Sequence, residues 1–423
     1  MRRRLSYGMV GGGPGAFIGD VHRMAAELDG LARIAAGAFS SDPERSAAKG
    51  AEVGLDPDRV YGSYAEMAAA EAARGGDERL DFVVVVTPNH LHFDVARTFL
   101  EADFHVVCDK PLTTTVADAE ALCRLVASGD RVFALTHNYG GYPMVKDARH
   151  LVRGGTLGEI RRIQLEYFQG WLSSPLEESG HPQAAWRTDP ARAGAAGALG
   201  DIGTHAHHLA RYVTGLEVEA LCGELTTFVP TRRLEDDASL LIRWNGGVRG
   251  TLTVSQVAAG EENGLAIRVF GSEGSIAWRH DDAETLWHRT PDGRARARRR
   301  GHGWISPAAL RASRIPPGHP EGFIEGFGNL YRNVISTIGA LDEGRTPAEA
   351  DLDFPTVWDG ARGVHFLERA VESGRLGAWV DARYEPPGEP PAEPRKPAEP
   401  AESVEPADVA TAAPGRGTAE AGP

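Results

Sequence analysis

The sequence predicts an α/β protein that begins with a doubly wound parallel sheet and continues into a second α/β unit with an antiparallel sheet. Short apolar runs alternate with helical stretches up to about residue 136, which is the pattern of a parallel sheet covered by helices. The run DFVVVV at residues 81–86 is apolar almost throughout, as expected of a strand buried on both faces. From about residue 217, apolar and polar side chains alternate along several strands, which indicates a sheet with one buried face.

The composition is that of an ordinary cytoplasmic protein with two folded domains. The chain has 423 residues, of which 42% are hydrophobic, and a formal net charge of -14, which argues against a general nucleic-acid binder. The cysteines Cys108, Cys123 and Cys222 cannot complete a disulfide set and are not spaced as metal ligands, so reduced thiols and no metal site are expected. No apolar run approaches the roughly 18–20 residues that span a bilayer, and the basic start MRRRL is not followed by the apolar region of a signal peptide.

The first domain is expected at residues 1–138. Its strands are expected at residues 5–10, 33–39, 81–86, 104–108 and 131–136. The first strand runs into GGGPGAFIGDVH, where Gly11, Gly13 and Gly19 resemble the glycine fingerprint of a dinucleotide-binding βαβ unit. The loop is longer than GxGxxG requires, so the prediction depends on the strands around it as much as on the glycines.

Two motifs lie at the carboxyl ends of predicted strands, which is where parallel sheets bind ligands. TPNHLH closes the third strand at residues 87–92, and CDKPL closes the fourth at residues 108–112. The second motif places Lys110 at the rim of the sheet, in the extended backbone that a following proline favours. Taken alone, Lys110 would be interpreted as a surface lysine.

The second domain is expected at residues 139–384 and a disordered tail at residues 385–423. Helices are expected at residues 143–153, 321–341 and 356–372, and strands at residues 160–171, 217–228, 238–244, 248–257, 266–270 and 275–278. The basic run Arg294–Arg300 is interpreted as a solvated loop rather than a phosphate or nucleic-acid site, because the whole chain is acidic. The tail is made of Pro, Ala and Glu with almost no large apolar side chains, so it cannot bury enough surface to offset its ordering entropy.

The stretch GALGDIGTHAHHLARYV, residues 197–213, carries two stripes at helical spacing. An apolar stripe would face a core, and Asp201, His205, His208 and Tyr212 form a polar stripe beside it. A carboxylate one turn before an imidazole can orient a general base and stabilise its protonated form. The alternative is that Asp201 only caps the helix and that the histidines lie on a solvated face.

Taken together, these motifs resemble the Gfo/Idh/MocA family, which groups glucose–fructose oxidoreductase, inositol dehydrogenase and a rhizopine-catabolism protein. Gly11–His22, TPNHLH, CDKPL, AAWRTDP and GDIGTH occur in this order between about Leu5 and Glu372. The resemblance implies an N-terminal Rossmann domain and a C-terminal α/β domain with a large, mostly antiparallel sheet. It also implies NAD or NADP as cofactor, a sugar or polyol as substrate, and a homodimer or homotetramer.

The resemblance further implies the residues of the site. Lys110, Asp201 and His205 match the family's catalytic positions, with Asp109 in place of the usual glutamate. The expected cofactor-binding residues are Gly11, Gly13, Phe17, Ile18, Gly19, Ser40, Ser41, Arg45, Thr87, Pro88, Asn89, His92, Asp109 and Lys110. The expected substrate-binding residues are Lys110, Tyr139, Gln169, Trp186, Arg187, Asp201 and His205, with His208 beside them.

These residue types suit hydride transfer from a carbinol carbon, whose hydroxyl must lose its proton as the hydride leaves. His205 could take that proton while Asp201 orients the ring, and Lys110 would hydrogen-bond the same oxygen. The expected function is an NAD(P)-dependent dehydrogenase acting on a secondary hydroxyl or ketone of a sugar, glycoside or inositol-type polyol. Two alternatives stay open: a redox-neutral enzyme with retained NAD that cleaves or epimerises a glycoside, and a non-catalytic dinucleotide sensor.

The end of the second strand slightly favours NAD over NADP. NAD-selective domains place an acidic residue about 20 residues past the glycine motif, and counting from Gly19 reaches Ser40 instead. Ser40, Ser41 and Arg45 could accept a 2′-phosphate, whereas Asp42 nearby would repel it.

Overall fold

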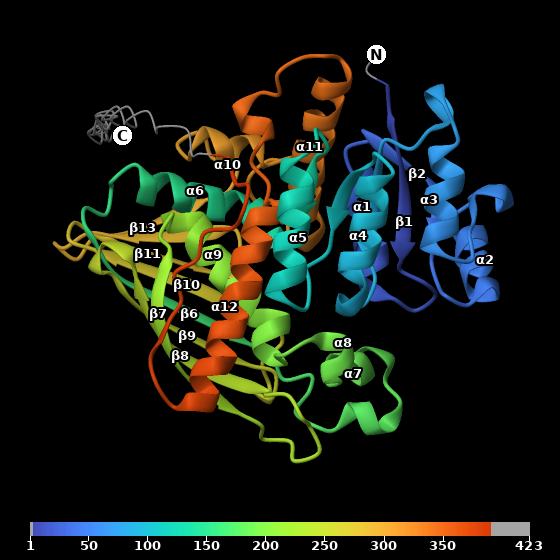
Figure 1. The fold of residues 1–423 in the computed structure, drawn as a ribbon. Helices are drawn as coiled ribbons and strands as arrows, with labels where there is room; N and C mark the ends of the chain where they lie inside the picture. Colours follow the sequence, from blue (N-terminus) through green and yellow to red (C-terminus); the bar gives the residue numbers. More distant parts are fainter. Residues whose placement is uncertain (1–2, 391–423) are drawn as a thin grey trace, which may run out of the picture.

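The computed structural model describes residues 3–390, in which helices pack against two sheets (Figure 1). The first sheet is parallel, with the strand order β2-β1-β3-β4-β5. Its strands are β1 (Leu5–Gly11), β2 (Ala32–Ala38), β3 (Phe82–Val86), β4 (His105–Cys108) and β5 (Phe133–Leu135). Every residue of β3 is buried, as predicted for a central strand that helices cover on both faces. The predicted parallel sheet is therefore confirmed.

Two helices from the C-terminal part of the sequence help to build the core around this first sheet. The helices that follow its strands are α1 (Phe17–Glu27), α2 (Pro43–Glu52), α3 (Tyr64–Ala72), α4 (His92–Glu101) and α5 (Val116–Ala127). Two later helices, α11 (Phe323–Asp342) and α12 (Val357–Leu376), lie beside α1 and α5 respectively (Figure 1). Phe327 and Tyr331 of α11 belong to one apolar core with Tyr7 and Val21. The C-terminal helices thus tie the first sheet to the rest of the molecule.

The second sheet is mixed but mostly antiparallel, as predicted. Its order is β13-β12-β11-β10-β6-β9-β8-β7-β14, and in the described residues only β6 and β9 pair in parallel. The strands are β6 (Ile160–Phe168), β7 (Val218–Thr226), β8 (Asp237–Trp244), β9 (Arg249–Ser255), β10 (Gly264–Gly271), β11 (Ser275–Arg279), β12 (Thr285–Arg289), β13 (Ala295–Arg299) and β14 (Val380–Asp381). The helices α6 (Pro143–Arg153), α9 (Thr204–Thr214) and α12 cover one face of it (Figure 1). The short helices are α7 (Pro182–Arg187), α8 (Pro190–Ala193) and α10 (Pro307–Arg311). Between residues 3 and 390, no helix is both long and apolar enough to cross a membrane.

The prediction of a solvated loop at Arg294–Arg300 is wrong. Most of the run forms β13, which pairs with β12 at the edge of the second sheet. Arg298 forms an ion pair with Asp147 of α6, with 2.5 Å between Nε and Oδ2, and the buried Arg300 pairs with the equally buried Glu321 at 2.8 Å. Acidic partners from distant parts of the chain neutralise these arginines, so the run contributes to structure.

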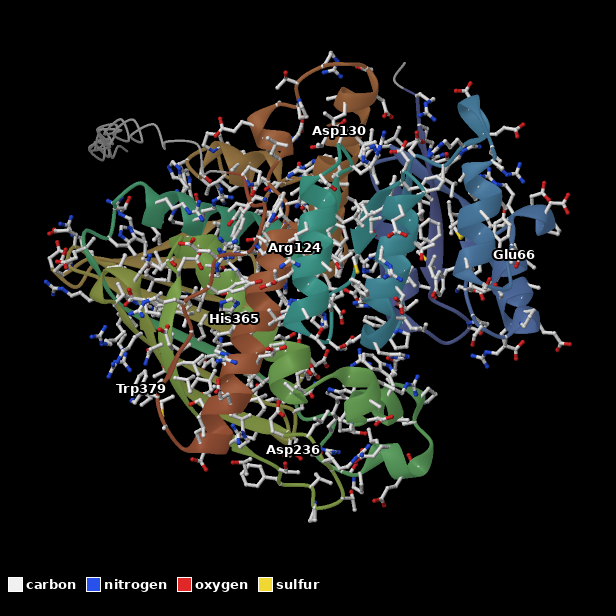
Figure 2. The ribbon with its side chains drawn as sticks, in the orientation of Figure 1. Glu66, Arg124, Asp130, Asp236, His365 and Trp379 are labelled. Atoms are coloured by element: carbon white, nitrogen blue, oxygen red, sulfur yellow. The ribbon has the colours of Figure 1, made fainter. Side chains whose placement is uncertain are left out.

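The first residues of the predicted tail, residues 385–423, pack against the folded part of the chain. His365 of α12 (Figure 2) stacks on Tyr384, with the ring centroids 4.3 Å apart. Trp358 of the same helix donates a hydrogen bond from Nε1 to Pro387 O at 3.2 Å. The first residues of that segment therefore pack against α12, and the remainder, from residue 391 on, lies outside the described residues.

Candidate active site

The loop after β1 allows a ligand to approach its backbone closely. Gly11 has a φ of +89°, and a Cβ atom there would lie 2.6 Å from Val86 O. A Cβ atom on Gly19 would lie 2.5 Å from the Cα atom of Gly12, so both positions exclude a side chain. Helix α1 starts directly after this loop at Phe17, and no side chain in the described residues caps it. Its first N–H groups can therefore bind an anion such as the pyrophosphate of a dinucleotide.

Further predicted cofactor residues lie at the same carboxyl edge of the sheet. Ser40 and Ser41 follow β2, Thr87 and Pro88 follow β3, and Asp109 and Lys110 follow β4. The hydroxyl of Thr87 is buried and has no hydrogen-bond partner within residues 3–390, which is unusual unless a bound group satisfies it. Arg45 donates a hydrogen bond to Pro14 O at 3.3 Å and so links α2 to the glycine loop. The residues present therefore fit a bound dinucleotide.

Asn89 and His92 have partners within the protein. Asn89 Nδ2 donates to Ala193 O at 3.0 Å. The ring nitrogens of His92 lie 2.7 Å from Pro111 O and 2.9 Å from Thr87 O. Both side chains thus brace the loops around the strand ends, and their role as direct cofactor contacts stays a prediction.

A cavity of about 620 Å³ lies where these strand ends face the second sheet. Phe17 and Ile18 at the start of α1 and Phe323 at the start of α11 form part of its wall. Of the predicted catalytic and substrate-binding residues, it is lined by Lys110, Tyr139, Gln169, Arg187, Asp201 and His205. The fold therefore brings together residues from both domains that are far apart in the sequence.

Asp201 is the centre of a charged cluster in this cavity. Lys110 Nζ lies 2.8 Å from Asp201 Oδ1, and Arg187 Nε lies 3.2 Å from Oδ2. Gln256 Nε2 donates to the same Oδ2 at 2.9 Å. Burial alone would raise the pKa of the Asp201 carboxyl, but Lys110 and Arg187 outweigh it and hold that pKa well below its usual range. Asp201 is therefore ionised, and it fixes the position of the Lys110 ammonium group.

The expected contact between Asp201 and His205 is not formed in the described structure. Leu199–Gly203 forms a π-helical turn in front of α9, so the spacing of an ordinary helix does not apply between the two residues. His205 instead places its Nδ1 3.5 Å from Nδ1 of His137. The prediction that Asp201 orients the His205 ring is wrong, because a single π turn leaves no sign in helical periodicity.

His205 is neutral in this environment. Burial lowers the pKa of His205 well below its usual value, and the nearby Lys110 lowers it further. The ring edge of Tyr139 packs against it, with centroids 5.1 Å apart. A neutral imidazole at the wall of a cavity can accept a proton from a bound hydroxyl.

A hydrogen-bonded network of uncharged groups forms another part of the wall, next to His205. The hydroxyls of Tyr139 and Tyr167 lie 2.6 Å apart, and Tyr167 donates to Asn263 Oδ1 at 2.6 Å. Gln169 Nε2 donates to the same oxygen at 2.9 Å, and Asn263 Nδ2 lies 3.1 Å from Nδ1 of His280. Asn263 and His280 were not predicted, since no motif surrounds them. Asn263 directly precedes β10, and the pairing of Gly264 with Phe168 brings it to the end of β6, where its side chain reaches Tyr167.

Two predicted substrate residues are placed elsewhere. Within the described chain, Trp186 is not among the lining residues of the cavity; its ring supports the guanidinium of Arg187, whose Cζ lies 4.2 Å from the ring centroid. Trp171 lines the cavity instead. His208 lies behind His205 and lines a different cavity. Trp186 and His208 are therefore not among the lining residues of this cavity in the described chain, and their role in binding substrate stays a prediction.

Comparison with known proteins identifies the family. Residues 5–137 match an oxidoreductase family with an NAD-binding Rossmann fold, and residues 145–277 match the GFO/IDH/MocA C-terminal domain. The uncharacterized oxidoreductase YfiI of Bacillus subtilis is 30% identical over 381 residues, covering 89% of this chain and 96% of that protein. Levoglucosan dehydrogenase of Pseudarthrobacter phenanthrenivorans is 28% identical over 408 residues, covering 90% and 98%. A crystal structure of an inositol dehydrogenase homolog from Azotobacter vinelandii, complexed with NADH and myo-inositol, is 35% identical, with a TM-score of 0.83 and coverage of 90% and 98%. The chain therefore belongs to the Gfo/Idh/MocA family of oxidoreductases with an NAD-binding Rossmann fold.

Proposed function

We propose that this oxidoreductase is an NAD(P)-dependent dehydrogenase that interconverts a secondary ring hydroxyl and a ketone of a neutral sugar, glycoside or inositol. The observation that carries the proposal is that Lys110, Asp201 and His205 line one cavity, which extends to the start of α1 after the glycine loop. When bound there, the nicotinamide would exchange a hydride with the carbinol carbon of the substrate.

The residues of the chain supply the proton chemistry and the binding of the oxygen. Lys110, held by Asp201, donates a hydrogen bond to the substrate oxygen and stabilises the negative charge that develops on it. The neutral His205 removes the hydroxyl proton during oxidation and returns it during reduction. Asp201 acts through Lys110, with which it is in contact at 2.8 Å.

The lining favours an uncharged polyhydroxylated ring. Tyr139, Tyr167, Gln169 and Asn263 offer hydroxyl and amide groups, which pair with hydroxyls and reject ligands that leave them unpaired. Arg187 is the cation that could recognise an acidic sugar, but its guanidinium is already bonded to Asp201 and supported by Trp186. Relatives named for levoglucosan, D-xylose and scyllo-inositol agree with a neutral substrate.

The test is a comparison of substrate classes with the purified protein. Neutral sugars, inositols, uronic acids and aliphatic alcohols are each supplied with NAD and NADP, and cofactor reduction is followed by absorbance. We expect reduction with members of the first two classes and very poor activity with aliphatic alcohols. Activity confined to aliphatic alcohols would contradict the proposal, and substrate conversion without net cofactor reduction would favour the redox-neutral alternative.

We also propose that the protein is a homodimer or homotetramer that associates through the second sheet. Leu241 of β8 is 53% exposed and Trp287 of β12 is 38% exposed, and apolar side chains on a sheet surface are typical of an interface. Light scattering of the purified protein measures the mass in solution, and a monomer would contradict this proposal.

A further inference from the structure

The contacts of His205 raise the question of what holds its ring. A neutral imidazole carries its one proton on either nitrogen, and only a nitrogen without a proton can act as a base. Asp201 is bonded to Lys110, Arg187 and Gln256, and in the described chain it makes no hydrogen bond to His205. Within residues 3–390, the one hydrogen bond of the His205 ring joins its Nδ1 to Nδ1 of His137. Since His205 lines the cavity, Nε2 is the nitrogen left for the substrate.

We propose that His137 is a positioning residue that fixes the tautomer of His205. His137 Nδ1 accepts the Nδ1–H of His205 and leaves the lone pair of His205 Nε2 directed to the substrate hydroxyl. Without this acceptor, His205 would divide between two tautomers, and the one with a proton on Nε2 could not act as a base. The inference rests on the proposed dehydrogenase function and adds to it a residue that touches neither substrate nor cofactor.

His137 is well placed for this role because its own ring is held from the other side. It follows β5 and is 1% exposed. Its ring stacks on that of His208, with centroids 4.4 Å apart and planes 9° apart. His208 stacks in turn on Tyr212, whose hydroxyl donates to Asp353 at 3.0 Å. The acceptor of His205 is thus the buried end of a stack of rings.

The charges around the pair agree with this direction of the hydrogen bond. Burial lowers the pKa of His137 well below its usual value, as do the neighbouring His208 and His205. The His137 ring is therefore neutral and can accept a hydrogen bond. During oxidation the substrate O–H bond breaks and an Nε2–H bond forms on His205. The resulting cation strengthens its Nδ1–H bond to His137, because charge-assisted hydrogen bonds are shorter and stronger than neutral ones.

The test compares two substitutions of His137 with one control. His137→Phe keeps a ring on His208 but removes the acceptor, whereas His137→Asn places an amide oxygen near the position of Nδ1. We expect His137→Phe to lower kcat by roughly ten- to a hundredfold, below the full range of a lost general base, with little change in KM. His137→Asn should recover most of the loss. His207→Phe is the matched control, because His207 is also buried on α9 and stacks on Phe366 with centroids 4.3 Å apart; we expect its kcat to stay near that of the wild type.

A second measurement separates positioning from simple support of the fold and does not depend on activity. Nitrogen NMR of histidine-labelled protein, with the His205 signals assigned by comparison with His205→Gln, reports which nitrogen carries the proton. We expect the Nδ1–H tautomer in the wild type and a mixture of both in His137→Phe. Wild-type kcat in His137→Phe, no recovery in His137→Asn, or an Nε2–H tautomer in the wild type would overturn the inference. A folded wild type that reduces no cofactor with any polyol would instead overturn the proposed function.

Discussion

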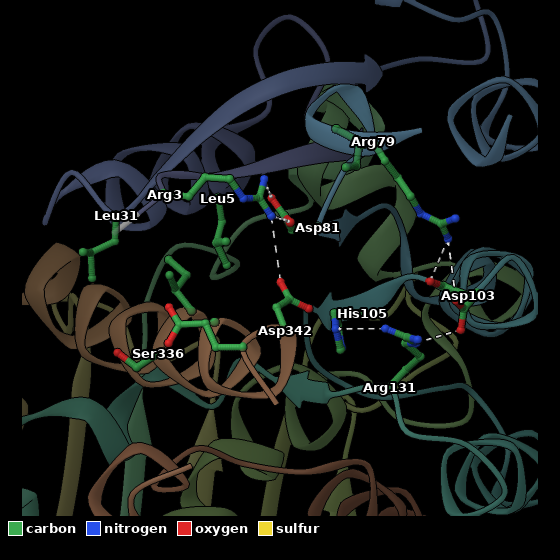
Figure 3. Close-up of a pocket in the computed structure, with 15 residues that line it drawn as sticks. Arg3, Leu5, Leu31, Arg79, Asp81, Asp103, His105, Arg131, Ser336 and Asp342 are labelled. Atoms are coloured by element: carbon green, nitrogen blue, oxygen red, sulfur yellow. Dashed lines mark hydrogen bonds and ion pairs between the residues drawn. The ribbon is translucent and has the colours of Figure 1, made fainter. Parts of the chain in front are cut away.

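Two cavities of similar size lie at opposite ends of the first sheet, and only one of them has the features of an active site. The site cavity at the carboxyl ends of the strands measures about 620 Å³, and the cavity at the amino ends measures about 590 Å³ (Figure 3). The second is lined by Arg3, Asp81, Asp103, His105 and Arg131, among other residues (Figure 3). Both cavities contain charged side chains, but the site cavity also carries tyrosine, tryptophan and phenylalanine side chains such as Tyr139, Trp171 and Phe327, which the other cavity lacks among its described lining residues.

The difference lies in how the charges are arranged. At the amino ends, Arg3 (45% exposed) pairs with Asp81 (7%), and Arg131 (34%) pairs with Asp103 (64%), so each pair has at least one side chain in contact with water. Such pairs are screened by water and contribute little. At the carboxyl ends, Lys110 and Asp201 are 14% and 18% exposed, and the start of α1 adds the positive end of a helix dipole. Pairs in which both charged side chains are largely shielded from water, and which converge on one cavity, mark the site.

The largest expected effect tests this comparison directly. Lys110→Ala should lower turnover by roughly two to four orders of magnitude, the range for electrostatic and acid–base groups, and His205→Ala should fall in the same range. The matched control is Arg131→Ala in the opposite cavity, which should leave turnover nearly unchanged. Steady-state kinetics with a titration of cofactor binding checks all three variants. If Arg131→Ala were as impaired as Lys110→Ala, the distinction between the two cavities would fail.

The next effect concerns stability near the site and its dependence on pH. Glu235 Oε1 accepts the N–H groups of Gly197 and Leu199 ahead of the π-helical turn. Burial raises the pKa of Glu235 from 4.5 to about 7, so the folded state keeps a proton that the unfolded state has lost. Its contribution to stability is therefore complete below about pH 4.5 and is lost as the pH rises through about 7.

Glu235→Gln should remove this dependence and raise the free energy of unfolding at pH 8 by up to about 3 kcal/mol, since each pKa unit corresponds to about 1.4 kcal/mol. Urea unfolding at pH 5 and pH 8 measures the free energy of unfolding of wild type and variant. Glu224→Gln is the control, because Glu224 is exposed. A lower stability of Glu235→Gln at pH 8 would contradict the assignment.

His105 in the opposite cavity should make a contribution to stability with the reverse dependence on pH. His105 accepts the N–H of Val132 at its Nδ1, 2.8 Å away, and burial, with help from Arg131, lowers the pKa of His105 to about 4. The folded state then lacks a proton that the unfolded state binds below pH 6.5. Its contribution is present above pH 6.5 and is lost as the pH falls to about 4.

His105→Asn keeps an acceptor for Val132 N but does not titrate. The loss of stability between pH 7 and pH 5 should be smaller in this variant by about 2 kcal/mol, with turnover unchanged when measured at pH 7. Urea unfolding at the two pH values checks the first expectation and kinetics the second. An equal loss in wild type and variant would mean that His105 is not held neutral.

The parallel sheet and its glycine loop were predictable because their signals are local. The run that forms β3 is apolar at successive positions, and the glycines of the loop lie at backbone positions where a Cβ atom would collide. That Lys110 lies at the ligand-binding edge follows from topology alone, since the carboxyl ends of parallel strands share one edge. These parts of the site required no knowledge of distant contacts.

The remaining parts of the site depend on contacts that a linear pattern does not contain. The sequence of β13 is typical of a basic loop, because the acidic partners of Arg298 and Arg300, Asp147 and Glu321, lie outside the run itself. Asn263 enters the site only through the register of β10 on β6. His205 contacts His137 instead of the expected Asp201 because of one π turn, which helical periodicity in the sequence does not reveal.

The smallest expected effect concerns the choice between NAD and NADP at the carboxyl edge of the first sheet. Asp42 follows β2 and caps α2, since its Oδ1 accepts from Glu44 N at 3.0 Å and from Arg45 N at 3.2 Å. The ribose of the dinucleotide is bound near the end of the second strand in Rossmann domains, so a negative charge at Asp42 should disfavour the 2′-phosphate of NADP, and we expect tighter binding of NAD.

Asp42→Ser keeps a good capping group and removes the charge. The preference should shift toward NADP by roughly tenfold, about 1.4 kcal/mol, as expected for one like charge at a few ångströms near a surface. Asp56→Ser is the control, because Asp56 caps another turn by accepting from Asp58 N. Fluorescence titration of both cofactors measures the ratio of the two Kd values, and a wild type that prefers NADP, or equal shifts in both variants, would show that Asp42 does not set the choice.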